Sequence, residues 1–197
     1  MPVQPKQEAA VATAENSRNL VLQMSISVDA FVAGPEGELD WIFADPDPEL
    51  TAWTVDSVWQ AGVHAMGSAT YREMAAHWPT STEPYAAPMN ELPKVVFSKS
   101  LTEAPWGETR IVRGDLVEEV GRLKAEPGNP IMAHGGARFA RALCAAGLVD
   151  EYRLRVHPVA LGAGLPLFSD LPARQRLELV DAKAYGSGVA VHIYRPT

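Results

Sequence analysis

Two glycine-containing turns carry the clearest chemical signal in this sequence. Met66-Gly67-Ser68-Ala69-Thr70 and His134-Gly135-Gly136-Ala137-Arg138 each follow a short apolar segment and precede residues with a helical pattern. Glycine allows a backbone to approach a phosphate closely, and the free amides of the next helical turn bind the anion. A single turn of this kind is more often only a tight turn. Two of them in one small domain predict a ligand that contains a pyrophosphate.

A third segment, Ser98-Lys99-Ser100, also follows a predicted strand. Ligands of open α/β sheets bind at the carboxyl ends of the strands, so these hydroxyl and ammonium groups are expected at the same edge as the glycine turns. We therefore favour a ligand site over the alternative in which the glycines only permit tight turns.

Carboxylates and imidazoles are the candidates for moving a proton. Asp29 interrupts an apolar strand, where a carboxylate needs a polar partner, and its role is open between function and structure. Glu49 lies with Asp47 at the start of a predicted helix, where acidic residues usually stabilise the helix itself. Of the five histidines, His134 is the best functional candidate because it abuts the Gly-Gly turn. Trp41 lies in an irregular segment and is a candidate for the wall of a pocket.

Several stricter motifs are absent, and their absence excludes classes of protein. Residues 62–67 have the glycine spacing of a phosphate-binding loop, but Ser68 stands where a nucleoside triphosphatase needs lysine. Gly162-Ala163-Gly164 lacks the third glycine and the helix of the dinucleotide fingerprint. The sequence contains no Gly-x-Ser-x-Gly elbow and no His/Cys cluster with metal-ligand spacing, so a serine hydrolase and a metal site are not expected.

The composition indicates one globular domain. The chain has 197 residues, of which 47% are apolar and 21% are charged, and its formal net charge is −7. An acidic balance argues against nucleic acid as a partner, and no apolar stretch is long enough to cross a membrane. The single cysteine, Cys144, indicates a reducing compartment, and we expect the cytoplasm. Residues 1–18 are expected to form a disordered leader before a single domain at 19–197.

Strands and helices alternate through most of the chain, and strands follow one another at its end. This order predicts a three-layer α/β fold around a mixed, mostly parallel central sheet with antiparallel C-terminal strands. Predicted helices begin near residue 48 and cover 69–76, 115–125 and 137–146. The predicted strands are 20–28, 63–66, 94–97, 109–112, 131–134, 151–159, 174–182 and 189–194.

The sequence resembles the dihydrofolate-reductase-like superfamily. Within it, the chain is most similar to stand-alone proteins like the reductase (C-terminal) domain of bifunctional riboflavin-biosynthesis deaminase/reductase. The resemblance runs from about Leu20 to the C-terminus. Its segments are Met24 to Phe31, Met66 to Tyr71, Lys94 to Lys99, and the block from His134-Gly135-Gly136-Ala137-Arg138 through His157-Pro158-Val159-Ala160-Leu161-Gly162 to Phe168, which is the most specific.

The resemblance implies a dihydrofolate-reductase fold and NADPH as the hydride donor. Gly67, Ser68 and Thr70 would meet the cofactor phosphates at one helix start, and Gly135, Gly136, Ala137 and Arg138 would meet them at the other. Ser98 and Lys99 would lie near the adenosine ribose and its 2′-phosphate.

The implied activity is reduction of a pyrimidine, a pteridine or a related small molecule, of the 5-amino-6-(5-phosphoribosylamino)uracil reductase type. Asp29 would face the nicotinamide with Phe31 and the Trp41 segment around the substrate, and Glu49 is the weaker candidate for a proton relay. Relatives often have arginine where this chain has Ser68, and glycine where it has Ala30. The alternative is a non-catalytic nucleotide-binding sensor or interaction module on the same fold. Relatives are commonly dimers, so a homodimer is expected.

Overall fold

The computed structural model describes residues 17–44 and 46–197. Most of the predicted leader therefore lies outside the described residues. Arg18, which that prediction assigned to the leader, is buried in the fold: its Nε donates to the Asn129 carbonyl at 2.6 Å and its amide donates to the Lys124 carbonyl at 2.8 Å. The described fold thus includes the last residue of the predicted leader.

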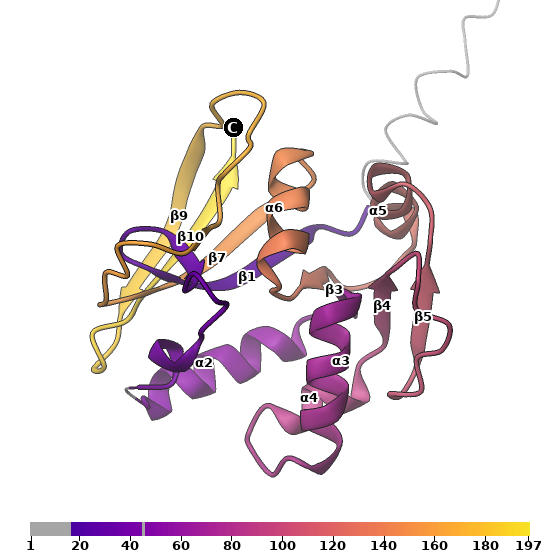
Figure 1. The fold of residues 1–197 in the computed structure, drawn as a ribbon, viewed down its shortest axis with the longest axis horizontal. Coiled ribbons are helices and arrows are strands. Elements are labelled where there is room, and N and C mark those ends of the chain that lie inside the picture. The colour runs from indigo at the N-terminus through magenta and orange to yellow at the C-terminus, as the bar shows by residue number, and fades with distance from the viewer. Residues whose placement is uncertain (1–16, 45) are drawn as a thin grey trace, which may run out of the picture.

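One eight-stranded sheet forms the centre of the molecule (Figure 1), in the order β5-β4-β3-β6-β1-β7-β10-β9. Neighbours from β5 to β7 are parallel, and β10 is antiparallel to both β7 and β9. Two short strands, β2 and β8, pair separately. The strands are β1 (Leu20–Ser27), β2 (Phe31–Ala33), β3 (Val63–Gly67), β4 (Lys94–Phe97), β5 (Thr109–Val112), β6 (Ile131–Ala133), β7 (Glu151–His157), β8 (Leu165–Pro166), β9 (Leu177–Ala184) and β10 (Ala190–Pro196).

Helices cover both faces of this sheet (Figure 1), which confirms the predicted three-layer α/β architecture. After α3 the structure has two short helices, η2 and α4, in a segment where the sequence pattern predicts no helix. No helix among the described residues is long and apolar enough to span a membrane. The helices are η1 (Asp40–Ile42), α2 (Pro48–Trp59), α3 (Ser68–His77), η2 (Trp78–Thr80), α4 (Ala86–Glu91), α5 (Leu116–Ala125) and α6 (Ala137–Ala145).

The central strand β1 presents two chemically different faces. Leu20, Leu22, Met24 and Ile26 alternate along one face and belong to the main hydrophobic core, which includes buried residues of α5 and α6. The opposite face carries Gln23, Ser25 and Ser27, all buried.

Helix α2 covers this polar face. The Ser57 hydroxyl of α2 donates to Gln23 Oε1 at 2.6 Å and accepts a hydrogen bond from Arg153 of β7 at 2.6 Å. Buried polar groups are stable only when hydrogen-bonded, so this face is set up for polar contacts.

The helices start in two different ways. The side chain of Asp47 caps α2, accepting from the amides of Glu49 and Leu50, and that of Asp115 caps α5. Gly67 and Gly136 precede α3 and α6 and supply no side-chain cap. The positive ends of α3 and α6 therefore keep their first amides free of a carboxylate.

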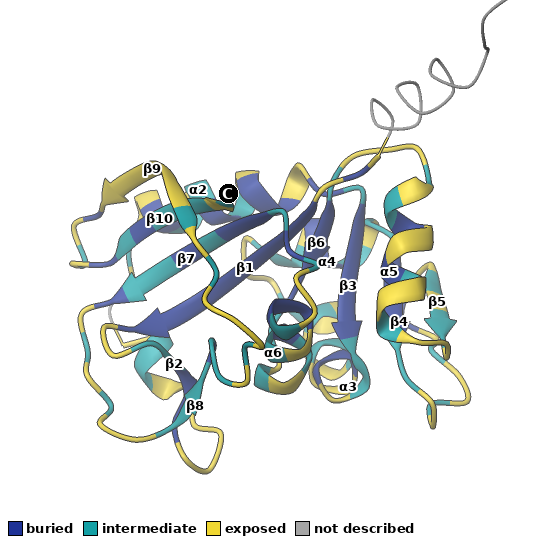
Figure 2. Ribbon diagram, turned by 90° about the horizontal axis from the view of Figure 1, so that it is seen from above, coloured by how far each residue is buried: buried dark blue, intermediate teal, exposed yellow. Residues whose placement is uncertain are grey.

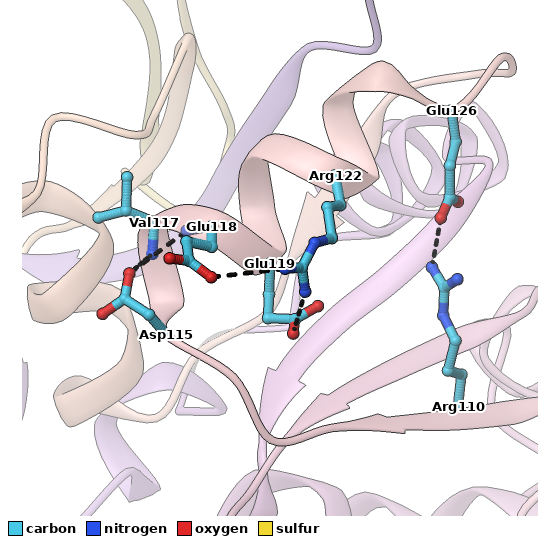
Figure 3. A network of polar contacts seen from close by, with 7 residues as sticks. All are labelled: Arg110, Asp115, Val117, Glu118, Glu119, Arg122 and Glu126. Carbon is cyan, nitrogen blue, oxygen red and sulfur yellow. Dashed lines mark hydrogen bonds and ion pairs between the residues drawn. The ribbon is translucent and has the colours of Figure 1, made fainter.

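Ion pairs within α5, and one to β5, lie on the exposed surface of this helix (Figure 3). Arg122 forms ion pairs with Glu119 at 2.8 Å and Glu118 at 3.4 Å, and Arg110 of β5 pairs with Glu126 at 2.8 Å. Such pairs near solvent are individually weak, and because Glu118 and Glu119 share Arg122, this surface keeps a net negative charge.

Strand β9 forms one edge of the sheet and is exposed over most of its length (Figure 2). It carries charged residues, among them Glu178, Asp181 and Lys183, and its pairing with β10 is interrupted by an irregularity between Ile193 and Tyr194.

Candidate functional site: the carboxyl ends of the central strands

The two glycine turns lie next to each other because β3 and β6 are neighbouring parallel strands. A hydrogen bond of 2.7 Å joins them, from the Thr70 hydroxyl at the start of α3 to the Gly135 carbonyl. Both α3 and α6 begin here without a side-chain cap. Two uncapped helix N-termini that face one region form a site for an anionic group.

The glycines differ in how strictly the fold requires them. Gly136 has φ +96°, and a Cβ there would collide with the Thr70 hydroxyl. A Cβ on Gly135 would lie 3.2 Å from Met24 Sδ, which is a tight contact. Gly67 has an ordinary φ of −79° and room for a side chain, because the nearest atom is Phe139 Cβ at 3.5 Å. Close side-chain neighbours explain Gly135 and, together with its positive φ, Gly136, but neither reason applies to Gly67.

The remaining predicted cofactor residues surround these turns. Ser98 follows β4, the strand beside β3, and its hydroxyl accepts from the Leu101 amide at 3.0 Å. Lys99 is exposed, Ser68 is half-buried, and Ala137 begins α6. Arg138 is exposed on α6 and lines a cavity of about 320 Å³ together with the Arg141–Asp170 ion pair.

Asp29 lies two residues after the end of β1 and binds the loop that follows β7. Its carboxylate accepts from the Ser27 hydroxyl at 2.6 Å and from the amides of Leu161 at 3.1 Å and Gly162 at 2.7 Å. The Ser27 hydrogen bond and these amides lower the pKa of Asp29. The group is therefore an ionised hydrogen-bond acceptor at neutral pH.

Sequence reasoning missed Ser27, which links the predicted substrate residues. It is fully buried, donates to Asp29 and accepts from the Phe31 amide at 3.0 Å. The signal was present, since Gln23, Ser25 and Ser27 repeat with the period of two that marks one strand face.

Trp41 lies at the end of β7, where its ring meets the edge of the His157 ring at a centroid distance of 5.3 Å. Because Ser27 and His157 are register partners, Trp41, Asp29 and Phe31 gather around the ends of β1 and β7. Within the described part of the chain, Glu49 makes no hydrogen bond or ion pair with these residues. Its side chain is exposed and forms an ion pair with Lys183 of β9 at 2.6 Å.

A buried histidine pair lies beneath the glycine turns. His134 Nε2 is 2.8 Å from His64 Nδ1, and His64 Nε2 is 3.1 Å from the Pro88 carbonyl. A carbonyl only accepts, so His64 carries its proton on Nε2 and accepts from His134. Burial lowers the pKa of His64 to about 4 and that of His134 well below its usual value. Both imidazoles are neutral, and the pair ties β3 and β6 to α4.

The fold and the paired glycine turns define a domain of the dihydrofolate-reductase type. Consistent with this, the structure aligns with dihydrofolate reductase from Enterococcus faecalis complexed with NADP(H) at a TM-score of 0.59 and 14% identity, over 91% of this chain and 96% of that one. This likeness confirms the predicted fold class.

The chain belongs to the RibD C-terminal domain family, whose model matches residues 18–191. It is similar to the uncharacterized protein YyaP of Bacillus subtilis, with 32% identity over 90% of this chain and 94% of that protein. It is also similar in structure to a putative riboflavin biosynthesis protein from Shewanella sp. PV-4, with a TM-score of 0.73, 22% identity and coverage of 91% and 99% of the two chains. The resemblance inferred from the sequence is confirmed.

Ala30 is strained, and its replacement by glycine is expected to stabilise the protein. Its φ of +66° costs a non-glycine residue about 1–2 kcal/mol, and the greater freedom of glycine in the unfolded chain offsets part of the gain. Ala30→Gly should therefore raise the free energy of unfolding by about 0.5–1 kcal/mol, measured by urea denaturation. The control Ala142→Gly, exposed within α6, should lower it. A lower free energy of unfolding in Ala30→Gly would contradict the conclusion that Ala30 is strained.

The histidine pair predicts a loss of stability in acid. The unfolded chain protonates His64 near pH 6.5, whereas the folded chain resists protonation until about pH 4. Stability is therefore complete above pH 6.5 and falls as the pH drops from 6.5 toward 4, by a few kcal/mol. His64→Gln should flatten this slope, measured by urea denaturation at several pH values. The exposed-site control His77→Gln should keep the wild-type slope; equal slopes in both variants would exclude the pair as the cause.

Proposed function

We propose that this protein is an NADPH-dependent reductase that transfers a hydride to a pyrimidine, a pteridine or a related small molecule. The observation that carries the proposal is the pair of uncapped helix N-termini joined by the Thr70–Gly135 hydrogen bond. Family membership and the likeness to a reductase complexed with NADP(H) support it. Within the family's activities, reduction of the 5-amino-6-(5-phosphoribosylamino)uracil type is the specific candidate.

The residues present fit the phosphates of such a cofactor. Gly67, Ser68 and Thr70 would supply amides from one turn, and Gly135, Gly136, Ala137 and Arg138 would supply amides from the other. The Thr70 hydroxyl donates to Gly135, so its role would be to hold the two turns at a fixed separation. Ser98 and Lys99 would lie near the adenosine ribose. Lys99, Arg72 and Arg138 are the candidate cations for a 2′-phosphate, because Ser68 offers none.

The bound cofactor would supply a hydride for an electrophilic carbon of the substrate. Asp29, Phe31 and Trp41 would surround that substrate at the ends of β1 and β7. An ionised Asp29, held by Ser27, suits orienting a donor group of the substrate better than delivering a proton. Glu49 would need to leave Lys183 to act as a proton relay. The proposed setting is a homodimer in the cytoplasm.

The alternative is a nucleotide-binding sensor or interaction module, which the replacement of arginine by Ser68 and of glycine by Ala30 mildly favours. The first step of the test is to measure the binding of NADPH and of NADH through energy transfer from tryptophan to the nicotinamide. Consumption of NADPH with 5-amino-6-(5-phosphoribosylamino)uracil or dihydrofolate would support the reductase. Binding without consumption across both substrate classes would favour the sensor, and no binding of either cofactor would exclude both.

Gly67→Asp should weaken cofactor binding without lowering the stability of the fold. Gly67 has the extended backbone of the capping residues Asp47 and Asp115 and room for a side chain, so aspartate there should cap α3 and leave stability unchanged or slightly higher. The same carboxylate should repel the pyrophosphate and weaken NADPH binding by about tenfold or more. Binding is measured by the same energy transfer, and stability by urea denaturation.

Gly67→Asn is the matched control, because it has the same shape without the charge. Aspartate should bind NADPH more weakly than asparagine, and added salt should reduce the difference. Equal affinities of the two variants at low salt would place the pyrophosphate elsewhere.

A further inference from the structure

The polar face of the sheet beneath α2 carries a cation, Arg155, for which the described residues supply no balancing charge. Arg155 is on β7, two residues beyond Arg153, and therefore faces the same side of the sheet. That side is the one toward α2, because Arg153 donates to Ser57 of α2. In register, Arg155 lies beside Ser25 of β1.

The Arg155 guanidinium has no hydrogen bond or ion pair within residues 17–44 and 46–197, and its Nε is a buried donor without a partner. It lies deep in the fold, and this burial lowers its pKa. The residue nevertheless keeps part of its surface accessible. A buried charge is costly when it is unpaired, so this geometry is that of a site completed by an incoming anion.

The neighbouring groups do not neutralise Arg155. Its charge acts on His134, which is neutral, and the Tyr85 hydroxyl lies within electrostatic range. The acidic residue of the same strand, Glu151, is already bound to Arg153 and Arg195. Among the described residues, a single positive charge therefore remains unbalanced at this point of the sheet.

Arg155 is anchored on a different strand from the glycine turns of the proposed phosphate site, although its charge acts on His134 beside one of those turns. The glycine turns follow β3 and β6, whereas Arg155 is on β7, beyond β1. Two strand spacings separate β6 from β7, which is about 10 Å. Arg155 lies on the side of β1 where Asp29, Phe31 and Trp41 gather, which is the proposed substrate side.

We propose that Arg155 binds a carboxylate of the substrate and so selects a carboxylate-bearing ring compound. The inference rests on the proposed function for the identity of the site. Among the proposed substrates, it favours a carboxylate-bearing pyrimidine, pteridine or related compound over the phosphoribosyl candidate named above. A guanidinium binds a planar carboxylate through two parallel hydrogen bonds. One monoanion balances the single charge, whereas a phosphate dianion would leave one negative charge buried without a partner.

The test compares two matched pairs of small probes, each measured by calorimetry with and without saturating NADP⁺. Orotate and uracil differ by a carboxylate, and uridine 5′-phosphate and uridine differ by a phosphate. Orotate should bind about 10- to 100-fold more tightly than uracil, the range expected for hydrogen bonds to a charged group. The phosphate should give no comparable advantage.

Arg155→Met should remove the preference for orotate, and Arg155→Lys should weaken it, because lysine keeps the charge but lacks the two parallel donors. The control Arg141→Met, on α6 across the sheet, should keep it. Arg155→Met should also melt at the wild-type temperature or higher, since an unpaired buried charge is removed; a purely structural arginine would lower the melting temperature.

No preference for orotate in the wild-type protein, a preference only for the phosphate probe, or a preference that survives Arg155→Met would each overturn the inference. These outcomes are distinct from failure of the proposed function. NADPH binding with loss of the carboxylate preference would contradict this inference alone. A carboxylate preference that depends on Arg155 without NADPH binding would instead contradict the reductase.

Discussion

The hydrogen bond between Thr70 and the Gly135 carbonyl is the contact on which the candidate site depends. It joins the start of α3 to the turn before α6, two segments far apart in the chain. The parallel pairing of β3 with β6 brings these segments together, and the His64–His134 pair braces the same two strands below. The fold thereby fixes the separation of two helix ends before any ligand arrives. A site whose donors are already fixed binds a ligand with less loss of freedom.

The second constraint is the unequal chemistry of the two faces of the sheet. The face toward α6 is a dry hydrophobic core, and its residues account for most of the buried apolar side chains. The face toward α2 holds serines, a glutamine, histidines and arginines, which are nearly all engaged with one another. Apolar clusters also lie on this side, among them the one that joins α2 to β3 and β4, so this face combines apolar packing with a polar network. The unpaired Nε of Arg155 is informative because its neighbours on this face, Ser25, Ser57 and Arg153, are hydrogen-bonded.

The sequence was sufficient to predict the fold because its signals are local. Alternation of strands and helices, glycine at helix starts, and consecutive final strands each depend on neighbouring residues. The neighbouring glycine turns followed from the rule that parallel strands end at one edge. The tie between Asp29 and the Leu161–Gly162 loop could not be predicted, since it joins residues far apart in the chain. Likewise, nothing in the sequence distinguishes unpaired Arg155 from paired Arg153, and helix α4 lies in a proline-containing segment typical of a loop.

The edge strand β9 affects how one copy of this protein can associate with another. An exposed strand offers unpaired backbone groups that invite another chain to add to the sheet. Along β9, side chains of both charge signs and the irregular pairing with β10 oppose that addition. These features oppose a ninth strand at this edge, whereas the exposed side chains of Leu179 and Val180 stay available for contacts with another molecule.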